Sequence, residues 1–253
     1  VDLEVPATSE IVIEGEMSMD PASFKPEGPF GEYPGYYTSV WSEPRPVLNV
    51  KCVTHRQDPI LESWIGMAAA HPQVHKNIIA SAQLWQLLEH IGVPGVTGVY
   101  SEPAQPGMVY VSIQQAYYGH AKQVAAALWA SSAASSDSAK YVVVTDADVD
   151  ITSTSSVMGA LVNRTRGAED ITIFPGTYGG NLDPGVHPDQ KKKAGGVGTW
   201  DRVLIDATWP WEWEPRKEWG SLKHPPPCQA EPEMLENVRR RWSEYGFEKD
   251  ISS

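Results

Sequence analysis

The chain has 253 residues, of which 41% are apolar and 21% charged, the balance of an ordinary globular protein with one or two domains. Its formal net charge of −12 argues against broad binding to nucleic acids or anionic membranes, because both require a basic surface. The sequence has no apolar run long enough to cross a bilayer, so we expect no membrane partner. Its two cysteines are far apart, which predicts no disulfide framework and a cytoplasmic protein.

The first part of the chain predicts short antiparallel strands joined by Pro-rich connections. Residues 10–16 and 47–56 alternate between apolar and polar side chains, and 60–65 has the length of a further short strand. Between the first two, residues 27–37 read EGPFGEYPGYY, with three Gly and two Pro. Neither a helix nor a regular strand tolerates this density of Gly and Pro, so the segment is predicted to form a shaped loop.

The middle of the chain predicts an α/β arrangement, because strand and helix patterns alternate there. We expect helices over 76–91, from 118 to about 134 and over 155–164, and strands over 96–100, 108–114, 140–145, 170–174 and 203–208. The apolar run 140–145 is typical of a strand buried on both faces. Residues 176–200 show no periodicity and are predicted to form a mobile loop or lid.

The last part of the chain predicts segments that lie outside the core. Residues 209–219 read WPWEWEPRKEW and indicate an exposed arm. A stiff spacer of three prolines then precedes a charged amphipathic helix expected over 231–245. Such a terminal helix is expected to dock elsewhere, and the partner subunit of an oligomer is one candidate.

Glu27 and Glu32 are the candidate acid/base residues. The loop bends between them, and Phe30, Tyr36 and Tyr37 are placed to exclude water from a cavity that both carboxylates share. Two carboxyl groups in different surroundings have different pKa values, which general acid/base chemistry requires. The alternative is a surface connection whose glutamates are solvated.

Asp146, Asp148 and Asp150 follow the apolar run 140–145. An apolar strand that ends in Asp-x-Asp is how nucleotide-sugar glycosyltransferases hold Mg²⁺ or Mn²⁺, so a metal-dependent glycosyltransferase is a second hypothesis. In the structural alternative, Asp150 caps the next helix and the other two order the turn. A non-catalytic assembly module is a third hypothesis.

Two further polar residues have both a functional and a structural interpretation. Lys140, directly before the apolar run, is either a phosphate contact or a solvated lysine. His120, at the expected start of a helix, is more typical of a structural hydrogen-bonding residue than of a catalyst. The histidines show no metal-binding spacing in the sequence.

Six stretches, taken in order, resemble the UbiD family of decarboxylases. They are EIVIEGE (10–16), PEGPFGEYPGYY (26–37), THRQDPI (54–60), YYGHAKQV (117–124), KYVVVTDADVD (140–150) and KEWG (217–220). Each is weak alone, but the ordered set is specific and covers most of residues 5–225. The resemblance implies reversible non-oxidative decarboxylation of an aromatic, heteroaromatic or α,β-unsaturated acid. It also implies prenylated FMN as the cofactor, with a divalent metal, usually Mn²⁺, and often K⁺.

The resemblance also implies roles for single residues. Glu32 falls at the position of the family's proton donor, and Glu27 at the carboxylate that pairs with an arginine. Lys140 matches the lysine that contacts the cofactor phosphate, and Arg164 resembles an arginine near the monovalent-cation site. The substrate pocket is expected to include Tyr33, Ile65, Met67 and Leu182.

The family's arginine, and its Asn, His and Glu metal ligands, lie before the point where this sequence begins. We therefore expect the chain to be the C-terminal part of the enzyme, completed by missing residues or by another chain. The expected fold class is α/β: the C-terminal part of a split β-barrel flavin-binding domain (1–65), a connecting helix (66–95), an α/β oligomerisation domain (96–225) and a C-terminal helix or arm (226–253). The expected assembly is a homodimer or a higher oligomer.

Overall fold

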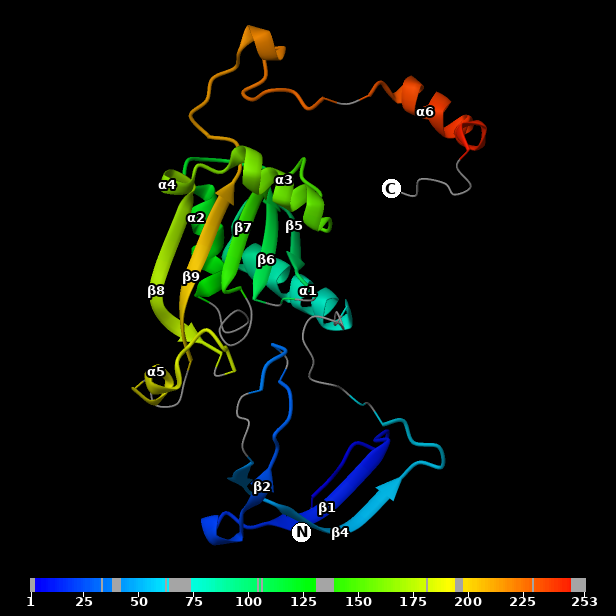
Figure 1. The fold of residues 1–253 in the computed structure, drawn as a ribbon, viewed down its shortest axis with the longest axis vertical. Coiled ribbons are helices and arrows are strands. Elements are labelled where there is room, and N and C mark those ends of the chain that lie inside the picture. Colours follow the sequence, from blue (N-terminus) through cyan, green and yellow to red (C-terminus); the bar gives the residue numbers. More distant parts are fainter. Residues whose placement is uncertain are drawn as a thin grey trace. The chain divides into compact units, whose positions relative to one another are not determined.

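The computed structural model describes residues 3–32, 34–37, 42–61, 63, 74–103, 105, 107–130, 139–180, 182–193, 198–228 and 230–246. The chain divides into two compact units, Val1–Thr208 and Trp209–Ser253, each of which is described by itself (Figure 1). The finer boundaries that the sequence suggests, at residues 65, 95 and 225, stay predictions. Among the described residues, no helix combines the length and the apolar character that a membrane crossing requires.

Two small antiparallel ribbons form the first part of the chain; the alternating patterns predict the strands of the first ribbon but not those of the second. In one, β1 (Ile11–Met17) pairs with β4 (Leu48–His55); in the other, β2 (Lys25–Glu27) pairs with β3 (Glu43–Arg45), and a short 3-10 turn (Pro21–Ser23) precedes β2. All eight residues of β4 are exposed. These ribbons therefore contribute no buried core of their own among the described residues.

A five-stranded sheet follows, with the strand order β5-β6-β7-β9-β8 (Figure 1). Its strands are β5 (Val96–Ser101), β6 (Met108–Ile113), β7 (Tyr141–Asp146), β8 (Ile171–Gly179) and β9 (Gly198–Ala207). The central strands β6, β7 and β9 are parallel, and both edge strands are antiparallel to their neighbours. The predicted alternation of strands and helices is confirmed, and the unit is a mixed α/β structure.

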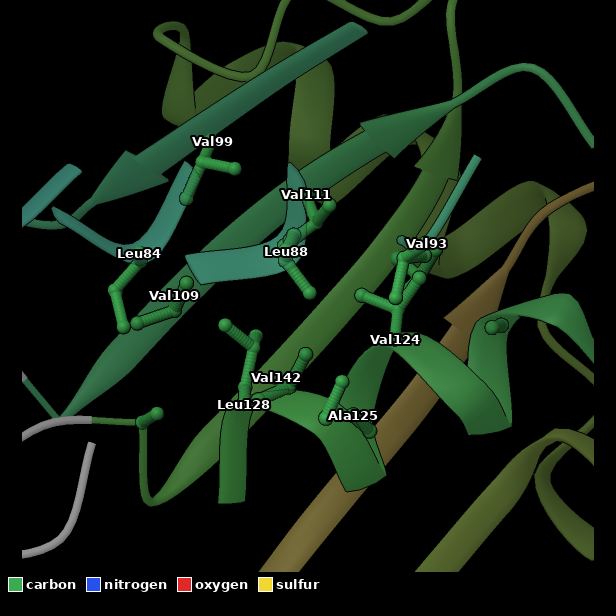
Figure 2. Close-up of a cluster of buried hydrophobic side chains, with 14 of the residues drawn as sticks. Leu84, Leu88, Val93, Val99, Val109, Val111, Val124, Ala125, Leu128 and Val142 are labelled. Carbon is green, nitrogen blue, oxygen red and sulfur yellow. The ribbon is translucent and has the colours of Figure 1, made fainter. Parts of the chain in front are cut away.

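Helices cover both faces of this sheet. The covering helices are α1 (Val74–Ile91), α2 (His120–Trp129) and α3 (Thr154–Arg164); this part of the chain also contains the short α4 (Gly167–Asp170) and α5 (Pro188–Lys193). Val142 and Val144 of β7 pack with α1 and α2, and Val143 between them packs with α3. Because successive strand residues point to opposite faces, α1 and α2 lie on one face and α3 on the other. Figure 2 shows Leu84 and Leu88 of α1 and Leu128 of α2 meeting over the strands in the larger cluster.

The prediction that residues 176–200 form an irregular loop is wrong for most of the segment. β8 continues to Gly179, α5 occupies 188–193, and β9 begins at Gly198. The Pro175-Gly176 pair indicates a strand end, but the register of β8 against β9 shifts between Phe174 and Thr177 instead. Gly176 has a φ of +67°, which a glycine adopts without strain, and the bulge lets the strand resume beyond it.

Two other expected elements reach beyond the described residues. The helix expected to extend to about residue 134 is α-helical to Trp129, and 131–138 lie outside the description. Ile60 and Leu61 belong to no strand, and most of the rest of the expected strand 60–65 also lies outside it.

The second unit consists of an aromatic segment and a terminal helix. The rings of Trp209, Trp213 and Trp219 follow one another at centroid distances of 5.8 Å, and the ring of His224 stacks on Trp209 at 5.0 Å. A 3-10 turn (Lys217–Trp219) lies within this segment. The helix expected over 231–245 is α6 (Pro232–Arg240), followed by a 3-10 turn (Trp242–Tyr245), and no residue of α6 is buried.

Candidate functional site

Glu27 and Glu32 lie on the connection between β2 and β3. Glu27 is the last residue of β2 and faces Glu43 across the ribbon. Glu32 lies near the tip of the connection, where its N–H donates to the Tyr36 carbonyl at 3.0 Å and its carbonyl accepts from the Gly35 N–H at 2.8 Å. The tight Gly/Pro-rich turn therefore determines the backbone conformation of Glu32, while strand pairing determines the backbone conformation of Glu27.

Among the described residues, the charge partner of Glu27 is Arg45 of β3. Its Nε lies 3.6 Å from Glu27 Oε2, while Nη2 of the same guanidinium lies 2.8 Å from Glu43 Oε2. More than half of each of these side chains is exposed, so the pairs contribute little to stability. No hydrogen bond joins Glu27 to Glu32 among the described residues.

The aromatic side chains of this loop are exposed, so the described chain by itself does not provide the expected shielding. Phe30 is 52% exposed, Tyr36 61% and Tyr37 62%. A two-stranded connection has no second layer of its own to pack against, so its aromatic side chains stay in contact with water. Tyr33, the expected pocket residue beside Glu32, lies outside the described residues, as do Ile65 and Met67.

Lys140, the candidate phosphate contact, lies in the five-stranded sheet region, directly before β7. The sheet holds its backbone on both sides, because the Tyr141 N–H donates to Gly107 O at 2.8 Å and the Val203 N–H donates to Lys140 O at 3.0 Å. Its ammonium lies 2.7 Å from Asp183 Oδ2, and the Lys140 side chain is 27% exposed. The structure therefore rejects the interpretation of a fully solvated lysine.

The surroundings of Lys140 are compatible with a bound phosphate. A Cβ on Gly185 would lie 3.7 Å from Lys140 Nζ, and a Cβ on Gly107 would lie 3.6 Å from Lys140 Cβ. Glycine at both positions keeps the space beside the lysine clear of side-chain atoms, and an ammonium is a common phosphate ligand. The candidate pocket residue Leu182 is half-buried and directly precedes Asp183.

Arg164 clamps the first two carboxylates of the DADVD motif. Its Nη2 lies 2.7 Å from Asp148 Oδ2 and its Nη1 3.2 Å from Asp146 Oδ2, while Gln115 Nε2 donates to Asp146 Oδ1 at 3.0 Å. Burial disfavours the charged guanidinium, but the bonds and charges of Asp148 and Asp146 outweigh it and raise the pKa of Arg164. An arginine thus occupies the carboxylates that a glycosyltransferase metal would need.

Lys140 and Arg164 act at opposite ends of β7. Lys140 precedes the first strand residue, while Asp146, the partner of Arg164, is the last. A strand advances about 3.3 Å per residue, so Lys140 and Asp146 are separated by roughly 20 Å. The structure does not bring these two candidates into one site. The described part of the chain also contains no group of three or more His, Cys, Asp or Glu residues arranged to hold a metal ion.

The turn after Asp148 is ordered differently from the structural interpretation of the sequence. Asp150 Oδ1 accepts hydrogen bonds from the N–H and Oγ1 of Thr152, which lower the pKa of Asp150. The N-cap of α3 is Ser153, whose Oγ accepts from the Ser156 N–H at 3.3 Å. Asp150 therefore orders the turn, and Ser153 caps the helix.

His120 is the structural residue that its position predicts. It is 1% exposed, and its Nδ1 accepts from the Ala116 N–H at 3.3 Å. Burial lowers the pKa of His120, although a hydrogen bond with the backbone of Pro94 acts in the other direction. The ring also lies 4.5 Å from that of Tyr117, measured between centroids. These contacts fix the start of α2.

Asp183 and Gln115 are the polar partners that sequence reasoning missed. Asp183 is 43 residues from Lys140, and Gln115 is 31 residues from Asp146. Neither lies in a recognisable motif, and neither has the short helical spacing that indicates a contact in advance. Only the folding of the sheet and its connections reveals them.

Two family models match the chain. The model described as the 3-octaprenyl-4-hydroxybenzoate carboxy-lyase Rift-related domain matches residues 1–68, and the one described as the C-terminal domain of the same carboxy-lyase matches residues 74–207. An uncharacterized protein from Synechocystis sp. is 32% identical over 251 residues, which are 98% of this chain and 46% of that protein.

Solved structures of UbiD-class enzymes have the same fold. HmfF from Pelotomaculum thermopropionicum in complex with FMN is 32% identical, with a TM-score of 0.71 over 93% of this chain and 47% of that chain. An evolved dimeric form of HmfF in complex with prFMN is 31% identical, with a TM-score of 0.64 over 93% and 45%. The vanillic acid decarboxylase of Sedimentibacter hydroxybenzoicus in its open form is 30% identical, with a TM-score of 0.67 over 95% and 48%.

The chain therefore belongs to the UbiD family of carboxy-lyases. It spans about half the length of the relatives it matches.

Proposed function

We propose that this chain is the C-terminal half of a UbiD-type decarboxylase that uses prenylated FMN. The reaction would be the reversible non-oxidative decarboxylation of an aromatic, heteroaromatic or α,β-unsaturated carboxylic acid. The observation that carries the proposal is the family match over residues 1–68 and 74–207, which includes the loop with Glu27 and Glu32. The likeness to HmfF in complex with FMN supports the flavin.

In this proposal, Lys140 holds the cofactor phosphate, and the neighbouring Gly107 and Gly185 place no side chain beside the lysine. When bound, prenylated FMN supplies the electron sink that decarboxylation requires and that no side chain provides. The bond between the substrate carbon and its carboxylate breaks, and CO₂ leaves. Glu32 then donates its proton to that carbon as a general acid.

Glu27 pairs with an arginine that the remaining half of the enzyme supplies. The contact with Arg45 is long and exposed, so a closer arginine would replace it at small cost. Preceding residues of the same protein, or a second chain, would supply that half together with most ligands for Mn²⁺ and K⁺. Arg164 would lie in the vicinity of the monovalent cation, and Tyr33, Ile65, Met67 and Leu182 would line the substrate pocket.

The exposed ribbons support a completed flavin-binding domain. β4 exposes all eight of its residues, and an isolated two-stranded ribbon is marginally stable in water. Strands from the remaining half would cover the apolar side chains of β1 and β4, extend the split barrel and bury the aromatic side chains of the loop. The complete enzyme would then assemble as a homodimer or a higher oligomer.

The test uses the assembled enzyme, with this chain and the remaining half together. We expect flavin absorbance in the purified protein and CO₂ release from at least one member of a panel of aromatic, heteroaromatic and α,β-unsaturated acids. Glu32→Gln should retain the flavin and lose CO₂ release, while Glu14→Gln, an exposed change on β1, should retain both. An assembled protein that forms an oligomer but binds no flavin would favour the non-catalytic assembly module.

A further inference from the structure

Asp183 has no part in the proposed chemistry, yet it forms an ion pair with the proposed phosphate ligand, Lys140. The Lys140 ammonium and Asp183 Oδ2 are 2.7 Å apart. The carboxylate side is the more deeply enclosed, because the Asp183 side chain is 10% exposed and that of Lys140 27%. Lys140 and Asp183 therefore form a partly buried ion pair rather than a contact between two exposed side chains.

The same carboxylate organises the turn from Gly180 to Val186, in which residue 181 lies outside the described residues. Its other oxygen, Oδ1, accepts from the Gly185 N–H at 2.7 Å. The Asp183 N–H donates to Gly180 O at 3.3 Å, and the Val186 N–H donates to Asp183 O at 3.4 Å. The turn is therefore anchored to β7 through Lys140, and it carries Leu182, the candidate pocket residue.

A phosphate and the Asp183 carboxylate would compete for the same ammonium group of Lys140. A phosphate placed against Lys140 brings its negative charges close to the charge of Asp183, and like charges repel strongly where water is partly excluded. Releasing Asp183 from the lysine instead would break the 2.7 Å ion pair of an enclosed carboxylate, which is also costly. Either way, phosphate binding at Lys140 changes the free energy of the 180–186 turn.

We propose that Asp183 competes with the cofactor phosphate for Lys140 and thereby couples cofactor binding to the turn that carries Leu182. The inference rests on the proposed function of Lys140. Coupling of this kind is reciprocal: the carboxylate weakens phosphate binding, and phosphate binding loosens the turn by the same factor. The consequence is that the substrate pocket responds to whether the cofactor phosphate is in place.

The first test compares FMN with riboflavin, which lacks the phosphate, in the assembled enzyme. Asp183→Asn removes the charge but keeps an oxygen that can accept from the Gly185 N–H. We expect this variant to bind FMN about tenfold more tightly, within the usual range of coupling between two sites, and riboflavin unchanged. Fluorescence titration of each flavin measures both affinities.

Two further variants control this experiment. Asp189→Asn makes the same change of charge on α5, at an exposed side chain that lies 3.6 Å from His187 Nδ1, and should leave both affinities unchanged. The double variant Lys140→Met/Asp183→Asn removes both members of the pair, so that neither charge is left unpaired in a partly buried position. It should bind FMN no more tightly than riboflavin.

The second test measures the turn itself. α5 contains Lys191, Lys192 and Lys193 and follows the turn directly. The rate of trypsin cleavage within α5 therefore reports the stability of the turn. We expect FMN to speed cleavage relative to riboflavin in the wild-type enzyme, and the difference to vanish in Asp183→Asn.

Weaker FMN binding by Asp183→Asn, or an equal change for both flavins, would overturn the competition while leaving the decarboxylase intact. If the wild-type assembled enzyme binds neither flavin, the proposed function fails and this inference fails with it.

Discussion

The five-stranded sheet and the N-terminal ribbons differ in what covers them. In β7, four of six residues are buried between helices on both faces, whereas all eight residues of β4 are exposed. The sheet holds its shape through its own core, but the ribbons present apolar side chains such as Val50 and Val53 to water. The proposed acid/base residues lie on the exposed side of this comparison. In the proposed function their geometry depends on surfaces that the remaining half supplies, while the site of Lys140 is held by the sheet and by the turn that carries Asp183.

The largest expected effect is on chemistry in the ribbon region. Glu32→Gln should lower the rate of CO₂ release by about 100- to 10,000-fold, the usual contribution of a general acid. Its side chain is outside the sheet's core, so the thermal unfolding of the sheet should be unchanged. Steady-state CO₂ release and circular dichroism melting separate the two effects. A rate within a few fold of wild type would remove Glu32 from the mechanism.

The next effect compares one substitution in the two regions. Leu128→Ala in the fully buried core should cost about 2–5 kcal/mol of unfolding free energy. Leu48→Ala on β4, where the side chain is 38% exposed, should cost less than about 1 kcal/mol in the isolated chain. Urea unfolding of both variants measures the difference.

The same pair sharpens the comparison in the assembled enzyme. If the remaining half covers β4, Leu48→Ala should become more costly there, while the cost of Leu128→Ala should not change. Equal costs for Leu48→Ala in the isolated chain and in the assembled enzyme would contradict a completed barrel over β4.

A smaller effect follows from the buried His120. Burial lowers the pKa of His120 below the 6.5 of a solvated histidine, so the unfolded chain takes up a proton first as the pH falls. The stability of the sheet should be complete above about pH 6.5 and decline below it, by up to about 1.4 kcal/mol per pH unit, until the folded-state pKa is reached. Denaturant midpoints between pH 7 and pH 5 measure this slope. His120→Asn, which keeps an acceptor for the Ala116 N–H, should show a shallower slope, and an identical slope would count against the assignment.

The smallest expected effect is at Arg45. Because its contact with Glu27 is exposed, Arg45→Gln should change the unfolding free energy by less than about 1 kcal/mol. If the proposed second arginine pairs with Glu27 in the assembled enzyme, CO₂ release should also stay within a few fold of wild type. A loss as large as that of Glu32→Gln would instead make Arg45 the functional partner of Glu27.

Much of the fold was predictable from local patterns, because those patterns depend on neighbouring residues. The apolar run that becomes β7 and the helical spacing that becomes α1 and α3 identify themselves without tertiary information. The full length of β8 was not predictable in this way, because the Pro175-Gly176 pair at its bulge indicates a strand end when only neighbouring residues are considered. Pairing with β9 on both sides of the bulge outweighs that local signal.

The candidate functional residues also divide into those that the sequence predicts and those that only the tertiary structure reveals. The sequence by itself determined the family through its ordered motifs, and with it the candidate roles of Glu27, Glu32 and Lys140, because a motif is a property of consecutive residues. Only the tertiary structure decided that Arg164 clamps Asp146 and Asp148, and that Asp183 reaches Lys140 from 43 residues away. The physical reason is that an ion pair between residues distant in the sequence depends on where the helices and connections pass, and no local spacing records that.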